Sequence, residues 1–165
     1  MPLVEYDRNH SILFRYPHGA QPVIKIKVTN PANNIVTIIE NAVVDSGADR
    51  STAPAFIGAI QLQHNLHRIK HGTNIKTPIG IGGSKNPMRG YMHSGIIQIY
   101  SGTTLISFLQ PLALDICFIE DSTGNSPDCP FVLGREDFFT YFHISFYNVA
   151  RYSCMRLTPR TDIVL

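Results

Sequence analysis

Short apolar runs with a period of two most constrain what this chain can fold into. Residues Pro22–Thr29 alternate between apolar side chains, such as Ile24 and Ile26, and lysine or threonine. This pattern is typical of a half-buried strand. The turn-forming segment Asn30–Asn34 follows, and a second β-branched run, Ile35–Ile39, comes next. The sequence therefore predicts a β-hairpin here.

Further runs of this kind recur, separated by glycine, proline and asparagine. They are Ala42–Val44, Ser94–Tyr100, Thr103–Leu109, Leu112–Ile119, Phe131–Leu133 and His143–Tyr147. Two segments favour helix instead. Pro54–Leu62 is a short candidate with Pro54 as its first helical residue, and Arg135–Phe142 is the better one. We expect an all-β fold with one short C-terminal helix.

Length and composition fit a single globular domain over residues 1–165. The chain has 165 residues, of which 44% are hydrophobic and 16% are charged. A net charge of +2 with scattered basic residues gives no electrostatic case for a nucleic-acid partner. The longest apolar region, Leu105–Ile119, is interrupted by Gln110, Pro111 and Asp115, so no membrane partner is expected either.

The cysteines indicate the cellular compartment. Cys117, Cys129 and Cys154 are an odd number with no metal-ligand spacing. Free thiols, buried or half-buried, in a reducing compartment are the favoured interpretation, and one disulfide is the alternative. The segment Met1–Gly19 has no apolar stretch of signal-peptide length. A cytoplasmic or otherwise intracellular location is therefore expected.

Asp45 is the first candidate for a chemical role. It ends the apolar run Ala42–Val44 and begins the turn Asp45–Gly47. Asp, Ser and Gly are ordinary turn residues, so the tripeptide alone favours a structural turn. However, a carboxylate directly after a buried strand lies at the edge of the core, where desolvation changes its acidity.

Two segments carry a resemblance to a known family. Asn41–Thr52 (NAVVDSGADRST) resembles the active-site segment of retropepsin-like aspartic proteases, the group that contains the retroviral proteases. Phe131–Phe139 (FVLGREDFF) resembles the apolar-apolar-Gly-Arg-Asp/Asn element that opens the C-terminal helix of that family. The two segments come in the family's order, and the resemblance covers about residues 22–147. It implies a retropepsin-like closed β-barrel subunit that forms a symmetric dimer.

The resemblance also implies a function. It implies that this protein is an aspartic endopeptidase, which hydrolyses a polypeptide substrate. The attacking water is expected to be activated by two Asp45 carboxylates, one from each subunit of a homodimer. Two carboxylates that share one proton supply both a base and an acid. Because the chain has a single Asp-Ser/Thr-Gly element, the second carboxylate has to come from another copy across a two-fold axis. No cofactor and no metal are expected.

The neighbours of Asp45 have implied supporting roles. Gly47 is expected to direct its backbone N–H at the carboxylates. Ser46 keeps the hydroxyl that in the family is hydrogen-bonded across the dimer. Ala48 lacks the hydroxyl that pepsin-like relatives direct at the ionised aspartate, so we expect a mildly acidic pH optimum.

Two more implied features lie farther along the chain. Asp49 and Arg135 are expected to form an ion pair that braces the active-site loop, the alternative being two unrelated surface charges. The glycine-rich loop that contains Ile81, Gly82 and Gly83 is expected to be the substrate-binding flap, the alternative being an ordinary glycine-rich loop.

Other interpretations stay open or are set aside. The spacing of His64, His67 and His71 would align them on one helix face able to hold zinc, but no acidic residue accompanies them, so solvated histidines are favoured. A non-catalytic dimerisation or peptide-binding module on the same fold is the alternative function. A carboxylate hydrolase acting on a non-peptide bond would need a second acid within one chain. The apolar tail, Ile163–Leu165, is expected to need a covering surface on its own core or on a neighbour.

Overall fold

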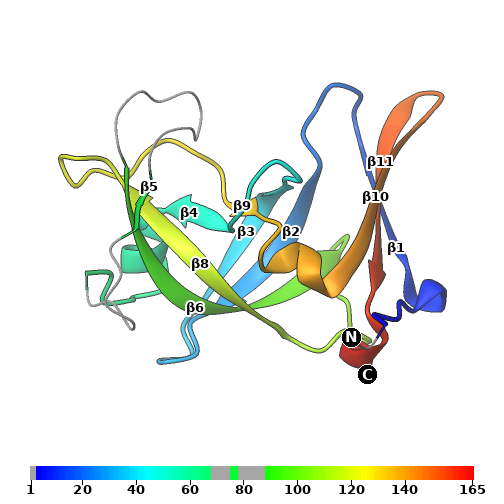
Figure 1. Ribbon diagram of the computed structural model, residues 1–165, viewed down its shortest axis with the longest axis horizontal. Coiled ribbons are helices and arrows are strands. Elements are labelled where there is room, and N and C mark those ends of the chain that lie inside the picture. Colours follow the sequence, from blue (N-terminus) through cyan, green and yellow to red (C-terminus); the bar gives the residue numbers. More distant parts are fainter. Residues whose placement is uncertain (1–2, 68–74, 78–87) are drawn as a thin grey trace.

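The computed structural model describes residues 3–67, 75–77 and 88–165. The strands in this part of the chain are β1 (Ile12–Tyr16), β2 (Val23–Thr29), β3 (Val36–Val44), β4 (Thr52–Pro54), β5 (Ile75–Thr77), β6 (Met88–Ser101), β7 (Thr104–Leu105), β8 (Leu112–Glu120), β9 (Val132–Leu133), β10 (Phe142–Val149) and β11 (Tyr152–Pro159). The short helices are η1 (Arg8–His10), η2 (Ile57–Gln61), η3 (Phe138–Tyr141) and η4 (Thr161–Ile163). Of the expected all-β fold with one short C-terminal helix, the mostly-β part is confirmed (Figure 1).

Two sheets organise these strands. The eight-stranded sheet has the order β2-β3-β9-β4-β8-β6-β5, with β7 paired to β6. Because β2 also pairs with β6, the strand order returns to its first member. The three-stranded sheet has the order β1-β11-β10 and joins the two ends of the chain. Figure 1 shows it on one side of the molecule, beside the larger sheet.

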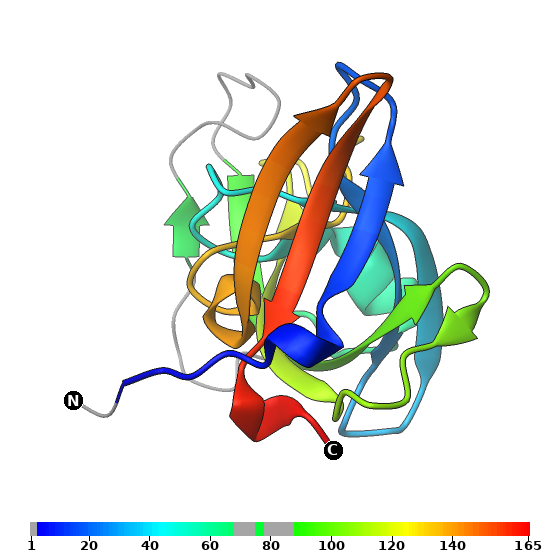
Figure 2. The same ribbon diagram turned by 90° about the vertical axis from the view of Figure 1, so that its right-hand side faces the viewer.

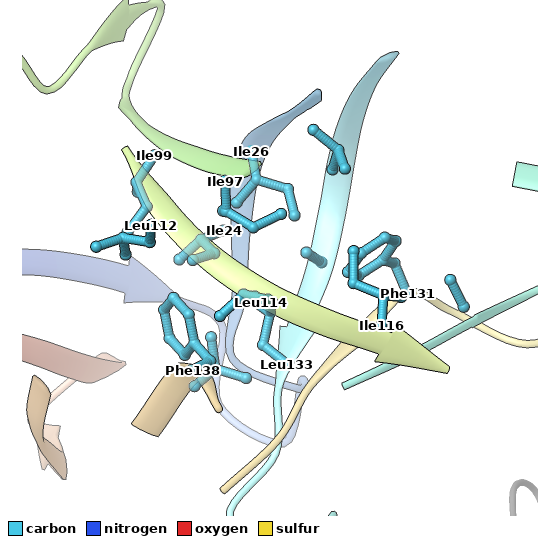
Figure 3. Packing of buried hydrophobic residues seen from close by; sticks show 14 of the residues in the cluster. Ile24, Ile26, Ile97, Ile99, Leu112, Leu114, Ile116, Phe131, Leu133 and Phe138 are labelled. Carbon is cyan, nitrogen blue, oxygen red and sulfur yellow. The ribbon is translucent and has the colours of Figure 1, made fainter. Parts of the chain in front are cut away.

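Alternation along the strands builds the core. In β2, Ile24, Ile26 and Val28 are buried, whereas the lysines between them are only partly covered, as the sequence pattern predicts. Apolar side chains of β6, β8 and β9 meet them from the other strands, and Phe138 of η3 closes the group (Figure 3). The core therefore draws on strands from all along the chain.

The turn between β2 and β3 also anchors a distant segment. Asn34 has φ 61°, a left-handed conformation that asparagine tolerates better than most residues. Asn30 is buried, and its side-chain amide donates to the Leu62 carbonyl at 2.8 Å. The predicted hairpin is present, and its first asparagine ties η2 to the larger sheet.

The three-stranded sheet has one apolar and one polar face. Ile12 and Ile144 both lie opposite Leu157, and this face packs on the core. The next row along the strands, in which Leu13 and Ser145 lie opposite Arg156, belongs to the outer face. In the sequence only β10 was predicted, as His143–Tyr147.

Several element boundaries differ from the prediction. The runs Ile35–Ile39 and Ala42–Val44 belong to one strand, β3, and Thr103–Leu109 contains only the short strand β7. Pro54 is not the first residue of a helix, because it ends β4 opposite Ile119. The helix expected over Arg135–Phe142 is reduced to the 3-10 helix η3.

The late start of η3 has a local cause. The backbone N–H groups of Arg135 and Glu136 donate to the carbonyls of Ala48 and Asp49, at 2.9 and 2.8 Å. The Asp137 side chain then accepts from the Phe138 N–H at 2.5 Å and acts as the N-cap. The Asp137 backbone, with φ −126° and ψ −70°, lies outside the helical region, so the helix begins only after it.

The apolar tail packs on its own chain. Ile163 is buried in the core, and Val164 forms a bridge with Leu109, whereas Leu165 is 78% exposed. Of the two covering surfaces considered from the sequence, the chain's own core covers Ile163. None of the helices in the described ranges is long and apolar enough to cross a bilayer.

All three cysteines are free thiols, as the favoured interpretation predicted. Cys117 and Cys154 are buried and Cys129 is half-buried. Burial raises the pKa of Cys117 and Cys129 to about 11. Such thiols stay protonated near neutral pH and are poor nucleophiles.

Candidate active site

The structure places Asp45 where a buried strand ends. Val44, the last residue of β3, is buried and pairs with Leu133 of β9, which runs parallel to β3. The Asp45 N–H continues this pairing by donating to the Leu133 carbonyl at 3.1 Å. Its backbone is thus part of the sheet, while its side chain is exposed at the sheet's edge.

A tight turn holds the Asp45 carboxylate. The Ala48 N–H donates to the Asp45 carbonyl at 3.2 Å, and the Gly47 N–H donates to Asp45 Oδ1 at 2.8 Å. A Cβ on Gly47 would lie 3.2 Å from the same carboxylate oxygen, closer than most side-chain contacts. The backbone direction expected for Gly47 is therefore present, and glycine suits this close approach.

The loop after Asp45 is fastened to the segment after β9. Besides the two backbone hydrogen bonds from Arg135 and Glu136, two side-chain ion pairs join successive residues of the two segments. The Arg135 guanidinium forms an ion pair with Asp49, as expected from the sequence, and Arg50 Nε lies 3.4 Å from Glu136 Oε2. These side chains are largely exposed, so they orient the loop more than they stabilise the fold.

A buried hydrogen-bond network lies beneath these ion pairs. Ser51 is fully buried, and its hydroxyl donates to Asp137 Oδ1 at 2.5 Å while accepting from the Gly134 N–H at 3.0 Å. Burial raises the pKa of the Asp137 carboxyl, and the hydrogen bonds from Ser51 and Phe138 oppose that rise. The network joins the Asp45 loop, the end of β9 and the start of η3.

Gly134 allows the two segments to approach. A Cβ at this position would lie 2.4 Å from the backbone carbon of Arg50. No larger residue fits without moving one of the segments. In the Gly-Arg pair of the sequence pattern, the glycine is therefore required for packing, and the arginine supplies the charge.

The exposed part of the site consists of carboxylate and hydroxyl groups. Apart from the Gly47 N–H, no group in the described chain forms a hydrogen bond or ion pair with the Asp45 carboxylate. Within the same residues, the Ser46 hydroxyl is exposed and has no hydrogen-bond partner.

The structure does not describe the residues that were expected to form the flap. Ile81, Gly82 and Gly83 all lie in the 78–87 segment, outside the described residues. The strands that flank this segment are described: Ile75–Thr77 (β5) pairs antiparallel with the start of β6. An antiparallel pair therefore brackets the predicted loop.

The histidines are not arranged as the spacing suggested. His64 and His67 lie in an irregular segment after η2, and His71 lies outside the described residues. His67 is exposed, whereas His64 is half-buried and not fully solvated: its ring lies 4.6 Å from that of His93 and 5.5 Å from that of Phe118. Its Nε2 is buried without a hydrogen-bond partner in the described chain, and burial, with His93 second, lowers its pKa to about 4.

Sequence reasoning missed Ser51, Asp137 and the Arg50–Glu136 ion pair. The signal was present, because residues 49–51 and 135–137 are two charged or polar triplets inside the two segments that carry the resemblance. Their pairing in register, Asp49 to Arg135 and Ser51 to Asp137, needed the parallel contact of β3 with β9.

Comparisons with known proteins add no family assignment. No protein-family model matches the chain, and no curated protein matches it either.

Proposed function

We propose that this chain is one subunit of a homodimeric aspartic endopeptidase of retropepsin type. In the active form, two copies meet across a two-fold axis and bring together two Asp45 carboxylates. The proposed subunit is a closed β-barrel, and the expected substrate is a polypeptide. The site needs no metal and no cofactor in this proposal.

The single observation that carries the proposal is the environment of the Asp45 carboxylate. It is exposed directly after the buried end of β3, accepts a hydrogen bond from the Gly47 N–H, and lies in a loop braced through Ser51. A surface turn does not need a buried hydrogen-bond network beneath it. A catalytic carboxylate does, because the reacting groups have to be held within a fraction of an ångström.

The proposed chemistry follows from two carboxylates that share one proton. One Asp45 is ionised and takes a proton from a water held between the two subunits. The other Asp45 is protonated and donates to the carbonyl oxygen as the water attacks the peptide carbon. The proton then passes to the leaving nitrogen, and the dyad returns to its starting state.

The other residues of the loop act by positioning. In the dimer, the Ser46 hydroxyl is free to hydrogen-bond to the second subunit. The Asp49–Arg135 ion pair keeps the loop against the segment after β9. Because Ala48 has no hydroxyl to stabilise the ionised aspartate, the proposed pH optimum is mildly acidic.

The test is peptide hydrolysis between roughly pH 4 and pH 7 by the wild type and by Asp45→Asn, at several protein concentrations. We expect the substitution to lower the rate by at least about 10³-fold. Wild-type activity per subunit is expected to fall steeply on dilution. Asp115→Asn makes the same chemical change at an exposed carboxylate of β8 and is expected to leave the rate within about two-fold.

Two outcomes would contradict the proposal in different ways. If Asp45→Asn cleaves as fast as the wild type, Asp45 is a turn residue and the catalytic role is wrong. If neither protein cleaves any peptide while both form dimers, the alternative function, a non-catalytic dimerisation or peptide-binding module, is the better account.

A further inference from the structure

The outer face of the three-stranded sheet is open and hollowed. Figure 2 views this face directly, with η1 at one end and no other helix or strand of the described chain lying over it. A groove of about 640 Å³ runs along it, and strands β1, β10 and β11 together with η1 line it. The inner face packs on the core, so this groove has no role in holding the sheet to the rest of the molecule.

Cations and hydroxyl groups line the groove. The groups that matter are Arg8, Arg156, His143, Ser11, Ser145 and Thr158. Among the described residues, no carboxylate lines it. Asp7, the nearest acid in sequence to Arg8, is engaged elsewhere, because it accepts from the His10 ring at 2.8 Å and from the Asn9 N–H at 2.9 Å.

The arginines of this face form no ion pairs within the described residues, unlike several cations elsewhere in the molecule. Lys25, Arg50, Arg135 and Arg160 each form an ion pair with a carboxylate. In the described chain, Arg8, Arg15 and Arg156 form none. Three unpaired arginines on one face attract anions, and the shallow groove brings two of them to the same ligand.

Tyrosine side chains orient two of these arginines, Arg156 and Arg15. The Arg156 guanidinium lies 5.6 Å from the centre of the Tyr147 ring and donates to the Tyr147 hydroxyl at 3.2 Å. Arg15 lies 4.9 Å above the Tyr152 ring. An arginine held on a ring loses less freedom when it binds a carboxylate, because its plane is already set.

We propose that this groove binds an acidic, extended peptide segment of a partner protein. Carboxylates of the peptide meet Arg8 and Arg156, which offer planar forks suited to them. The hydroxyls of Ser11 and Thr158, 2.9 Å apart, face polar groups of the peptide. Leu13, which is 42% exposed and lines the groove, contacts an apolar side chain of the same peptide.

An extended peptide fits the sheet better than a compact ligand does. In the described chain β1 and β10 are the outer strands of this sheet, so each has one edge without a neighbour. A peptide that lies across the face can therefore also reach backbone groups at an edge. The binding does not depend on catalysis by Asp45.

A nucleic acid is the weaker candidate for the same groove. Single strands bind by stacking bases on free aromatic rings. Here Tyr6 contacts His143 edge-on at 5.7 Å, and Tyr147 and Tyr152 are each covered by an arginine. With few free ring faces and a net charge of only +2, carboxylates are favoured over phosphates and bases.

The test is fluorescence anisotropy with a labelled peptide of about ten alternating glutamates and leucines, a length that spans two typical strands. The protein carries Asp45→Asn throughout, so that cleavage cannot consume the probe. We expect saturable binding that weakens as salt rises. Arg8→Ala and Arg156→Ala are each expected to weaken it about tenfold, which corresponds to ~1.4 kcal/mol.

Matched controls separate the groove from net charge. Arg151→Ala removes the same charge at the exposed tip of the β10–β11 hairpin and is expected to change affinity less than about two-fold. Arg156→Lys keeps the charge without the planar fork and is expected to bind with intermediate affinity. Circular dichroism on each variant confirms that the sheet is intact, and Arg8→Ala, outside the strands, tests the groove if Arg156→Ala unfolds.

Three results would overturn the proposal. In the first, the Glu-Leu peptide binds no better than a Lys-Leu peptide of the same length. In the second, folded Arg8→Ala and Arg156→Ala proteins bind like the wild type. In the third, a thymidine oligonucleotide of equal charge binds tighter than the peptide, which would assign the groove to nucleic acid.

Discussion

Ser51 is the residue on which the geometry of the candidate site depends most. Its buried hydroxyl is at once a donor to Asp137 and an acceptor for Gly134, and it lies six positions after Asp45 in the sequence. The ion pairs above it are exposed and contribute little to stability. A buried group that makes two hydrogen bonds contributes more, because its loss leaves the Gly134 N–H without its acceptor and removes one donor from the Asp137 carboxylate.

Ser51→Ala is therefore expected to lower the free energy of unfolding by about 1–3 kcal/mol. Urea denaturation followed by circular dichroism measures this loss. Ser46→Ala removes the same atom from an exposed hydroxyl, and we expect a change within about 0.5 kcal/mol. Equal stability of Ser51→Ala and wild type would mean that the network does not brace the loop.

At the scale of elements, the three-stranded sheet pairs strands that come from opposite ends of this chain. β1 and β11 are far apart in sequence, yet they pair within one chain. The apolar face of the sheet, which includes Ile12 and Leu157, packs on the larger sheet. The terminal segments are thereby part of the subunit's own core.

Ile12→Ala and Leu13→Ala form a matched pair of tests for this sheet. Ile12 is buried and Leu13 is 42% exposed on the opposite face. We expect Ile12→Ala to lower the free energy of unfolding by about 2–4 kcal/mol, and Leu13→Ala by less than about 1 kcal/mol. Similar losses for both would contradict the assignment of inner and outer faces.

The segment after η2 introduces a pH-sensitive contact. His64 packs on His93 and Phe118, and its folded pKa of about 4 lies below the ordinary value of 6.5. Between these two pH values, His64 is protonated in the unfolded chain and neutral in the folded chain. Stability from His64 is therefore fully present above about pH 6.5 and is lost as the pH falls through about 4.

Unfolding free energy measured from pH 7 down to roughly pH 4 is expected to fall less steeply in His64→Phe than in the wild type. For the wild type the slope from this group stays below ~1.4 kcal/mol per pH unit, because a single histidine can change the number of bound protons by no more than one. Asn65→Ala, at an exposed neighbour, is expected to keep the wild-type profile. A slope that is the same in His64→Phe would remove His64 as the cause.

At the scale of the whole molecule, the subunit offers half of an active site under the proposed function. The Asp45 carboxylate and the Ser46 hydroxyl are exposed together, and within the described chain neither forms a hydrogen bond or ion pair with another side chain. A symmetric partner would bring the same two groups to the opposite side of a two-fold axis. Activity should then belong to pairs of subunits, not to single chains.

Mixing wild type with Asp45→Asn tests this directly. If subunits exchange, equal amounts leave about one quarter of the dimers with two wild-type aspartates. We expect activity to fall to about that fraction of the value for an all-wild-type sample at the same total concentration, and not to one half. A fall to one half would indicate that each chain acts alone. Pre-incubation at low concentration, which promotes exchange, is the control for slow mixing.

The sequence by itself determined the features that depend on local order. The period of two in β2 predicted its buried face, asparagine and proline predicted the turn after it, and the apolar run before Asp45 predicted a carboxylate at the end of a strand. These are properties of neighbouring residues, because side-chain alternation and turn conformation arise within a few peptide units. The resemblance added Arg135 as the partner of Asp49.

Only the tertiary structure decided the contacts between distant segments. The helix expected from Arg135 starts after Asp137, because the Asp137 backbone is not helical where this segment is hydrogen-bonded to the loop after Asp45. The pairing of Ser51 with Asp137 and of β1 with β11 joins residues whose separation leaves no trace in a local pattern. Such contacts depend on how the sheets close on each other, and a side chain such as Ser51 acquires its role only when a partner from the far end of the chain arrives.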